Sequence, residues 1–479
     1  MDAGGAENPG LAREAVGRVR TIAFGTSVVA PSASAATVLV LVVAYAGFAS
    51  PLVVLITFAG SLCCALSIGQ FAGRVPSAGW AYTYNSRGLG PTAGFLTGWM
   101  MVFAYALFVP AGVGLTSAFT SQLLSSTLGV TIAPWVLFVV ILAAAVIIAY
   151  LGISRSSSAD VVLVAGEMAV IAALAVTVLV KIGPAHYSAA VLSPASSPHQ
   201  RPSDITDAMI YGITAFAGFE AAAALGEEAR DARRSMPASI VGIVVVTGIF
   251  YLLVVCAATF AVGRHGIGAL TGQASPLGFL TSRYWSPSVL WLIDLVIVLA
   301  GLGFVIATLN AAIRVLFTMG RERALPGSLA RLSRRQTPVV AIGGLAVITL
   351  VIGLPLTYVY GGTATFGYLA MIGGLPVVLV YLTVNIAVVR AFRTEFRSEF
   401  RPGPHLIIPA AASLVFLFPL WGILFPGPYT LVNLLPFIAF GWLLAGVMAA
   451  AILRTRHPAV FSRLGRPAAP EEGRQLEPD

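Results

Sequence analysis

The chain has 479 residues, of which 58% are hydrophobic and only 10% are charged. Soluble globular domains carry about 25% charged residues, so this composition excludes a soluble domain and indicates a polytopic membrane protein. The formal net charge of +9 does not indicate a nucleic-acid partner, because the basic residues are spread over many loops and form no single patch.

Twelve apolar segments are each near or above the roughly 20 residues that cross a bilayer. They lie at approximately residues 21–47, 51–73, 91–124, 132–152, 159–182, 205–227, 237–262, 287–318, 338–358, 363–390, 406–425 and 429–453. The first is too long for the apolar region of a signal peptide, so we expect it to be retained. The predicted units are an amino-terminal tail (1–20), a core of ten spans (21–400), two peripheral spans (401–454) and a carboxy-terminal tail (455–479).

The distribution of basic residues predicts the orientation of these spans. An even number of spans places both termini on one side of the membrane, and most arginines fall in the tails and loops of that side. The loops of the other side hold only Lys181, Arg201, Arg264 and Arg283. The positive-inside rule therefore predicts a multi-pass protein of the cell membrane with both tails cytoplasmic.

The first span contains a proline near its middle. Pro31 removes a backbone hydrogen bond and clashes with the preceding turn, and the hydroxyl groups of Ser32 and Ser34 compete locally for backbone partners. A kinked but continuous helix is the alternative interpretation, and it is the commoner result of a single membrane proline.

The sixth span has a second interruption, at Ala217-Gly218, and Glu220 follows it within apolar sequence. An ionisable side chain in hydrocarbon costs roughly 2.5 kcal/mol or more unless it faces a polar cavity. The alternative is a packing glycine in a continuous helix, with Glu220 bonded to a neighbour. Since the first and sixth spans begin two successive units of five, paired breaks there are typical of an inverted-repeat transporter with its site between them.

Three stretches resemble the amino acid/polyamine/organocation (APC) transporter superfamily. They are FAGRVPSAGWAYTYNSRGLGPTAGFLTGW (71–99), FAGFE (216–220) with the loop that follows it, and NAAIRVLFTMGRERALP (310–326). The resemblance implies the LeuT-type fold, in which five plus five inverted helices and two peripheral ones make an all-α polytopic protein of 12 transmembrane helices. It also implies that the first and sixth helices are broken, and that the protein takes up or exchanges amino acids or amines.

Backbone groups at the two breaks can bind both ends of an amino acid. Free N–H groups at a half-helix start suit a carboxylate, and free C=O groups at a half-helix end suit an ammonium. The candidate substrate-binding residues at the breaks are Val29, Ala30, Ser32, Ala33, Ser34, Phe216, Ala217, Gly218 and Phe219. In family members the first break holds the carboxylate and the sixth-span carbonyls hold the amine. For the rings of Phe216 and Phe219, packing against neighbours is an equal alternative.

Alignment with the family also predicts the side-chain pocket. Thr214 and Thr308 stand where arginine-selective members carry aromatic residues, so a long cation would lose the stacking on both of its faces. Ala104 and Tyr105 of the third span fall at family contact positions. The resemblance therefore favours a small or neutral amino acid over arginine or a polyamine.

Two carboxylates are candidates for proton coupling, Glu167 in the fifth span and Glu220 in the sixth. Glu167 stands where some sodium-independent relatives have a lysine. A carboxyl group at that depth can be neutral at rest and carry a proton. It could instead pair with a cation, help hold sodium together with Thr308, or bond to a neighbouring helix.

The predicted function is therefore secondary active transport, the proton-coupled uptake of a small or neutral amino acid by alternating access. An amino acid or amine exchanger (antiporter) and a polyamine transporter are the closer alternatives, and a non-transporting membrane sensor is a remote one. No enzyme activity, cofactor or metal site is expected, because no catalytic cluster, phosphate-binding loop or metal-ligand spacing occurs. The expected partners are the substrate, protons or sodium, and the lipid bilayer.

Overall fold

A computed structural model describes residues 17–465, except for 76, 78, 153–157, 227, 228, 230, 274 and 425–433. Its long helices are α4 (Ser50–Ala72), α6 (Pro91–Leu128), α7 (Pro134–Leu151), α8 (Ser158–Ile182), α10 (Ala232–Val262), α13 (Leu290–Arg321), α14 (Val339–Tyr360), α15 (Gly362–Thr394), α16 (Ile408–Leu424) and α17 (Phe437–Arg456). Every regular element in these ranges is helical, which confirms the predicted all-α polytopic class.

Shorter helices complete the bundle. They are α1 (Arg18–Val29), α2 (Pro31–Ala36), α3 (Val38–Ala46), α5 (Ala81–Leu89), α9 (Pro202–Phe216), α11 (Ile267–Thr271), α12 (Pro276–Tyr284) and α18 (Pro458–Phe461). Short 3-10 segments include η1 (Gly47–Ala49) and η5 (Phe219–Leu225). Neither α5 nor the pair α11 and α12 was expected from the sequence, because their short, partly polar stretches lack the long apolar pattern of a span.

Eleven helical stretches in the described residues are long and apolar enough to cross a membrane. The first expected span is not one of them, because its helical pieces α1, α2 and α3 have only 12, 6 and 9 residues. The last of these pieces runs on through η1 into α4, so Val38–Ala72 forms one stretch. The multi-pass membrane class follows from these helices, while the count of twelve remains a prediction.

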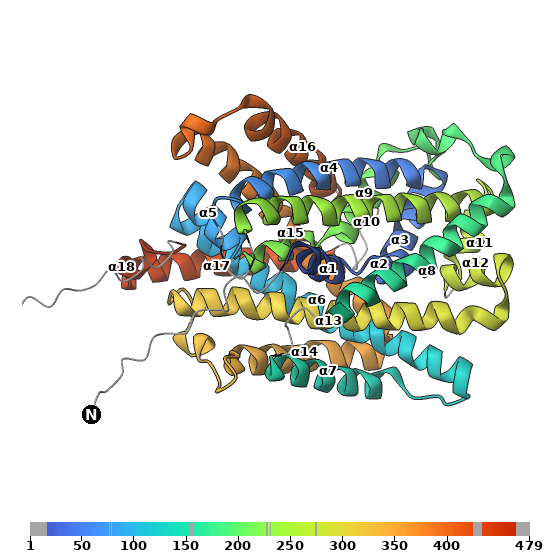
Figure 1. Cartoon of the computed structure of the whole chain (residues 1–479), viewed down its shortest axis with the longest axis horizontal. Coiled ribbons are helices and arrows are strands. Elements are labelled where there is room, and N and C mark those ends of the chain that lie inside the picture. The colour runs from blue at the N-terminus through green and yellow to red at the C-terminus, as the bar shows by residue number, and fades with distance from the viewer. Residues whose placement is uncertain are drawn as a thin grey trace, which may run out of the picture.

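The helices lie roughly parallel in one bundle (Figure 1). Helix α6 packs against α13, α4 against α10, and α7 against α14. Each pair joins helices at equivalent positions in two successive sets of five, as expected for an inverted repeat. Helix α17 is fixed to α6 by Trp99 and Trp442, whose rings stack at 4.5 Å while each indole N–H donates to the other residue's carbonyl oxygen at 2.9 and 3.0 Å.

The two ends of the bundle carry different elements. Helices α5 and α18 lie at one end, and α11 and α12 lie at the other (Figure 1). At the α5 end, Arg74 donates to Glu399 Oε2 at 2.5 Å, and this hydrogen bond lowers the pKa of the Glu399 carboxyl. Arg87 forms a second ion pair there, with Glu395. The arginine pattern predicts that this end is cytoplasmic.

Candidate functional site

The helical backbone of the first expected span is interrupted at Ala30, one residue before the proline. Ala30 adopts a left-handed conformation with φ 48° and ψ 65°. Its N–H donates a hydrogen bond to the Thr26 carbonyl oxygen, and this bond is the last of α1. Pro31 is therefore the first residue of α2, where its missing N–H is not needed. The Ser34 hydroxyl donates to the Val29 carbonyl at 3.2 Å, which satisfies one of the groups that the break releases.

The backbone of the sixth expected span is interrupted at the position that the sequence indicates. Helix α9 ends at Phe216, Ala217 has an extended ψ of 136°, and Gly218 is left-handed with φ 111°. The chain then continues as the 3-10 segment η5. The carbonyl of Ala215, in the last turn of α9, accepts a hydrogen bond from the Tyr251 hydroxyl of α10 at 2.7 Å.

The two interruptions touch each other. A Cβ atom placed on Gly218 would lie 2.9 Å from the carbonyl oxygen and 2.8 Å from Cγ1 of Val28, so only glycine allows this approach. Helix α1 also packs along η5. The end of one half-helix and the irregular backbone of the other therefore form a single buried junction inside the bundle.

Polar atoms without partners gather on the elements that meet there. Among the described residues, the hydroxyls of Thr26, Ser32 and Thr308 are buried and have no hydrogen-bond partner. They come from α1, α2 and α13, which contact one another. Buried hydroxyls are nearly always bonded, so these three are available to a polar ligand at the break. Sequence reasoning did not single out Thr26.

Glu167 reaches the same junction from α8. Its side chain is 5% exposed, and its carboxylate lies near the Ser32 hydroxyl at the first break, outside hydrogen-bond geometry. Glu220 lies on the other side of the junction and is 1% exposed. The fold thus brings both sequence-predicted carboxylates to the broken segments.

Glu220 is held by partners from three elements. Its Oε2 atom accepts the Gly218 N–H at 2.8 Å and the Tyr381 hydroxyl of α15 at 2.5 Å, and Oε1 faces the Tyr105 hydroxyl of α6 at 3.5 Å. This carboxylate therefore orients the irregular backbone of Gly218 and links it to two long helices. No sequence pattern points to Tyr381, since its contact with Glu220 joins residues 161 positions apart.

The predicted side-chain positions have different surroundings. Thr214 donates to the Ile210 carbonyl at 2.8 Å and lies next to Gly374 of α15. Ala104 and Ala33 are buried, at 0% and 3% exposure.

The two phenylalanine rings point to different helices. Phe216 stacks on Phe58 with ring centroids 6.0 Å apart and meets Tyr251 at 5.2 Å, whereas Phe219 lies 5.4 Å from Tyr381. The Phe216 ring therefore contributes to packing between α4 and α10.

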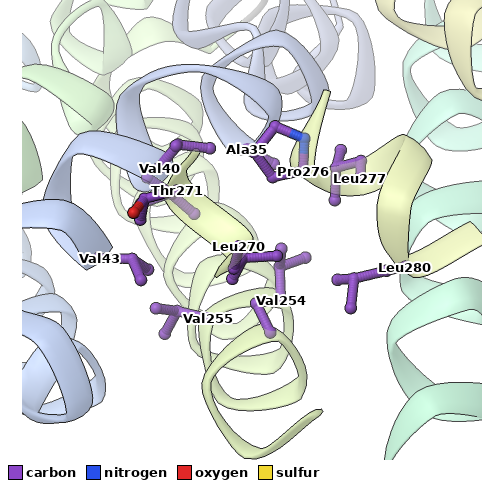
Figure 2. Close-up of a pocket in the computed structure, with 12 residues that line it drawn as sticks. Ala35, Val40, Val43, Val254, Val255, Leu270, Thr271, Pro276, Leu277 and Leu280 are labelled. Carbon is purple, nitrogen blue, oxygen red and sulfur yellow. The ribbon is translucent and has the colours of Figure 1, made fainter. Parts of the chain in front are cut away.

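An apolar pocket adjoins the junction on the α11 side. It is lined by Ala35, Leu39, Val40, Val43, Val254, Val255, Ala258, Leu270, Thr271, Pro276, Leu277 and Leu280. Figure 2 shows side chains of the α11–α12 region lying across from Val254 and Val255 of α10. Among the described residues that line this pocket none is charged, and Thr271 is the one with a polar side chain. Three buried hydroxyls that have no partner among the described residues lie instead on the elements that meet at the junction.

A bundle of membrane-crossing helices with two facing interruptions and buried polar groups between them defines a multi-pass membrane transporter. Comparison with known families supports this class: the chain matches the family described as "Amino acid permease" over residues 33–454. This protein belongs to the amino acid permease family. The predicted membership of the APC superfamily is confirmed, and with it the LeuT-type fold class.

Several named transporters are similar to this chain. The branched-chain amino acid permease BcaP of Lactococcus lactis is 25% identical over 412 residues, which cover 79% of this chain and 83% of that protein. BcaP of Bacillus subtilis is 26% identical over 415 residues, covering 82% and 83%. The methylthioribose transporter of Bacillus subtilis is 23% identical over 439 residues, covering 85% and 87%.

Proposed function

We propose that this permease is a secondary active transporter that takes up a neutral, aliphatic amino acid by alternating access. The observation that carries the proposal is the contact between Gly218 and Val28, which joins two broken backbones inside the bundle. A zwitterion needs a donor for its carboxylate and an acceptor for its ammonium, and such breaks supply both from the backbone. The substrate's constant part can then be bound without a charged side chain.

The side-chain pocket supports a neutral substrate. Thr214 and Thr308 stand where arginine-selective relatives carry the aromatic residues on which a long cation would stack, and the small, buried side chain of Ala104 suits an aliphatic substrate. The similarity to two branched-chain amino acid permeases over about four-fifths of the chain points in the same direction. Leucine, isoleucine and valine are therefore the first substrates to test.

The proposal also includes coupling of transport to protons, with Glu167 as the group that carries the proton. The carboxylate lies beside Ser32 at the first break and is almost fully buried. Because charging a carboxyl group is unfavourable in such surroundings, proton binding and release would favour different helix positions. Glu220 is less suited, since its Oε2 atom already accepts two hydrogen bonds that fix the sixth-span break.

A thermal-shift screen of the purified protein tests the substrate class. A ligand that binds only the folded state raises the apparent melting temperature, by an amount that grows with its concentration relative to Kd. We expect leucine, isoleucine or valine to stabilise the protein, and arginine and putrescine to have no effect. Stabilisation by arginine or putrescine instead would overturn the neutral-substrate proposal.

A further inference from the structure

A second group of buried polar atoms lies between Glu220 and the α5 end of the bundle, and the mechanism above does not use it. Asn385 of α15 is 1% exposed, and among the described residues neither its amide nitrogen nor its amide oxygen has a hydrogen-bond partner. Tyr84 of α5 is fully buried, and its hydroxyl is also without a partner. A membrane helix rarely keeps such groups unless they face a polar path.

These groups form a column that begins at Glu220. Asn385 follows Tyr381 by one helical turn, and Tyr381 donates to Glu220. The Cys64 thiol of α4 lies near both the Asn385 amide and Glu220, and as a weak donor and acceptor it does not satisfy the amide. Asn385 thus lies one helical turn beyond the Glu220 cluster.

The column continues to α5. Asn85 donates to Thr383 of α15 at 2.8 Å, while Gly88 packs directly against Ala387. Helix α5 therefore lies along the same stretch of α15 that carries Asn385, and Tyr84 of α5 stacks on Phe71 of α4 at 5.2 Å. All of these residues come from α4, α5 and α15, whereas Ser32, Glu167 and Thr308 belong to α2, α8 and α13.

We propose that Asn385 and Tyr84 line a water path that connects Glu220 with the α5 face of the protein, separate from the elements that carry the substrate-binding hydroxyls. When this face opens, water supplies hydrogen-bond donors and acceptors to both residues. Water from the α5 face then reaches Glu220 while the substrate junction stays closed. The ionisable groups facing the path are Glu220, Tyr105, Tyr381, Tyr84 and Cys64.

Cys64 is a natural probe for this path. It is 0% exposed, and a thiol in dry surroundings is inert because the reactive species is the hydrated thiolate. With Cys63→Ala and Cys256→Ala, Cys64 is the only thiol of the chain. A permanently charged methanethiosulfonate is added to inverted membrane vesicles, the thiolate attacks its thio sulfur, and a mixed disulfide forms as methanesulfinate leaves. Mass spectrometry of the denatured protein gives the rate.

We expect Cys64 to react from this face, and Asn385→Leu to slow the reaction at least tenfold. Asn385→Ser keeps a polar group and should stay within about threefold of the parent. Thr349→Val is the matched control, because it removes another buried, unpartnered hydroxyl far away on α14. A rate that Asn385→Leu leaves unchanged, or a Cys64 that never reacts, would overturn the proposal.

Thermal unfolding of the same variants shows whether folding is responsible. Replacing an unpartnered amide by a similar-sized apolar side chain should leave the melting temperature unchanged or raise it. A loss of labelling together with a large fall in melting temperature in both Asn385 variants would mean that Asn385 is structural. Because no substrate is added, the labelling result is independent of whether the proposed transport function is correct.

Discussion

Replacing Gly218 by leucine perturbs the contact that the proposed function requires. Gly218 has φ 111°, and a side chain in such a conformation costs on the order of 1–3 kcal/mol. A Cβ atom on Gly218 would lie 2.9 Å from the Val28 carbonyl oxygen, whereas ordinary van der Waals contact begins at 3.4 Å. The two backbones must therefore separate by about 0.5 Å before the rest of the leucine side chain is placed. The strain is small against a typical stability of about 5–15 kcal/mol, so the variant should still fold.

Uptake should be far more sensitive than folding. A misplacement of about 1 Å can reduce an enzyme's rate roughly a hundredfold, and leucine also fills the space where the backbone approaches the ligand. We expect Gly218→Leu to reduce amino acid uptake in cells at least about a hundredfold, and Gly218→Ala to be intermediate. Uptake is compared at equal membrane protein levels.

Gly344→Leu is the matched control, because a Cβ at this exposed glycine of α14 would meet nothing within 4 Å. It should transport normally. Normal uptake by Gly218→Leu would refute the argument that the sixth-span break binds substrate.

Three further predictions concern coupling, orientation and packing. In proteoliposomes, Glu167→Gln should lose the accumulation that a pH gradient drives but keep substrate exchange, since the amide mimics the neutral acid. Glu220→Gln should reduce both accumulation and exchange, because it weakens the hydrogen bonds around the sixth-span break. A cysteine at Gln273, between α11 and α12, should react with an impermeant reagent outside cells, whereas one at Ser235 should be protected. Trp442→Leu should lower stability by roughly 2–4 kcal/mol, because it removes a ring stack and an indole hydrogen bond.

Each of these predictions has a result that contradicts it. If exchange and accumulation fall together in Glu167→Gln, the residue is structural. If neither activity changes in Glu167→Gln and a sodium gradient drives uptake, the proton-coupling proposal is wrong. External labelling at Ser235 would reverse the topology. For the tryptophan pair, Leu444→Ala on the exposed face of α17 serves as the reference, and an equal loss of stability there would show that the stack contributes nothing specific.

Local chemistry explains which parts of the fold could be predicted. The Ala217-Gly218 interruption was found because glycine tolerates a left-handed backbone and a carboxylate follows it. The first interruption lies inside the range predicted from Pro31, residues 29–34, but the left-handed residue is Ala30, and alanine gives no sequence signal for that conformation. Pro31 marks the start of the next half-helix.

The contacts that complete the site depend on tertiary structure. Tyr381 reaches Glu220 from a helix far along the chain, and the contact between Val28 and Gly218 joins the two halves. Hydrophobic patterning predicts spans but not which of their faces meet. Helix α5 was missed for a related reason: its sequence AYTYNSRGL is short and polar, and it is helical because it packs on α6 and α15.

Counterflow of labelled leucine in proteoliposomes tests the central claim, that the backbone at two facing breaks binds the two ends of a neutral amino acid. Unlabelled leucine, isoleucine and valine should each drive exchange. Leucine methyl ester and 3-methylbutylamine lack the carboxylate and 4-methylpentanoate lacks the ammonium, so none of the three should compete. Absence of leucine counterflow, or effective competition by an analogue lacking either end, would contradict the account.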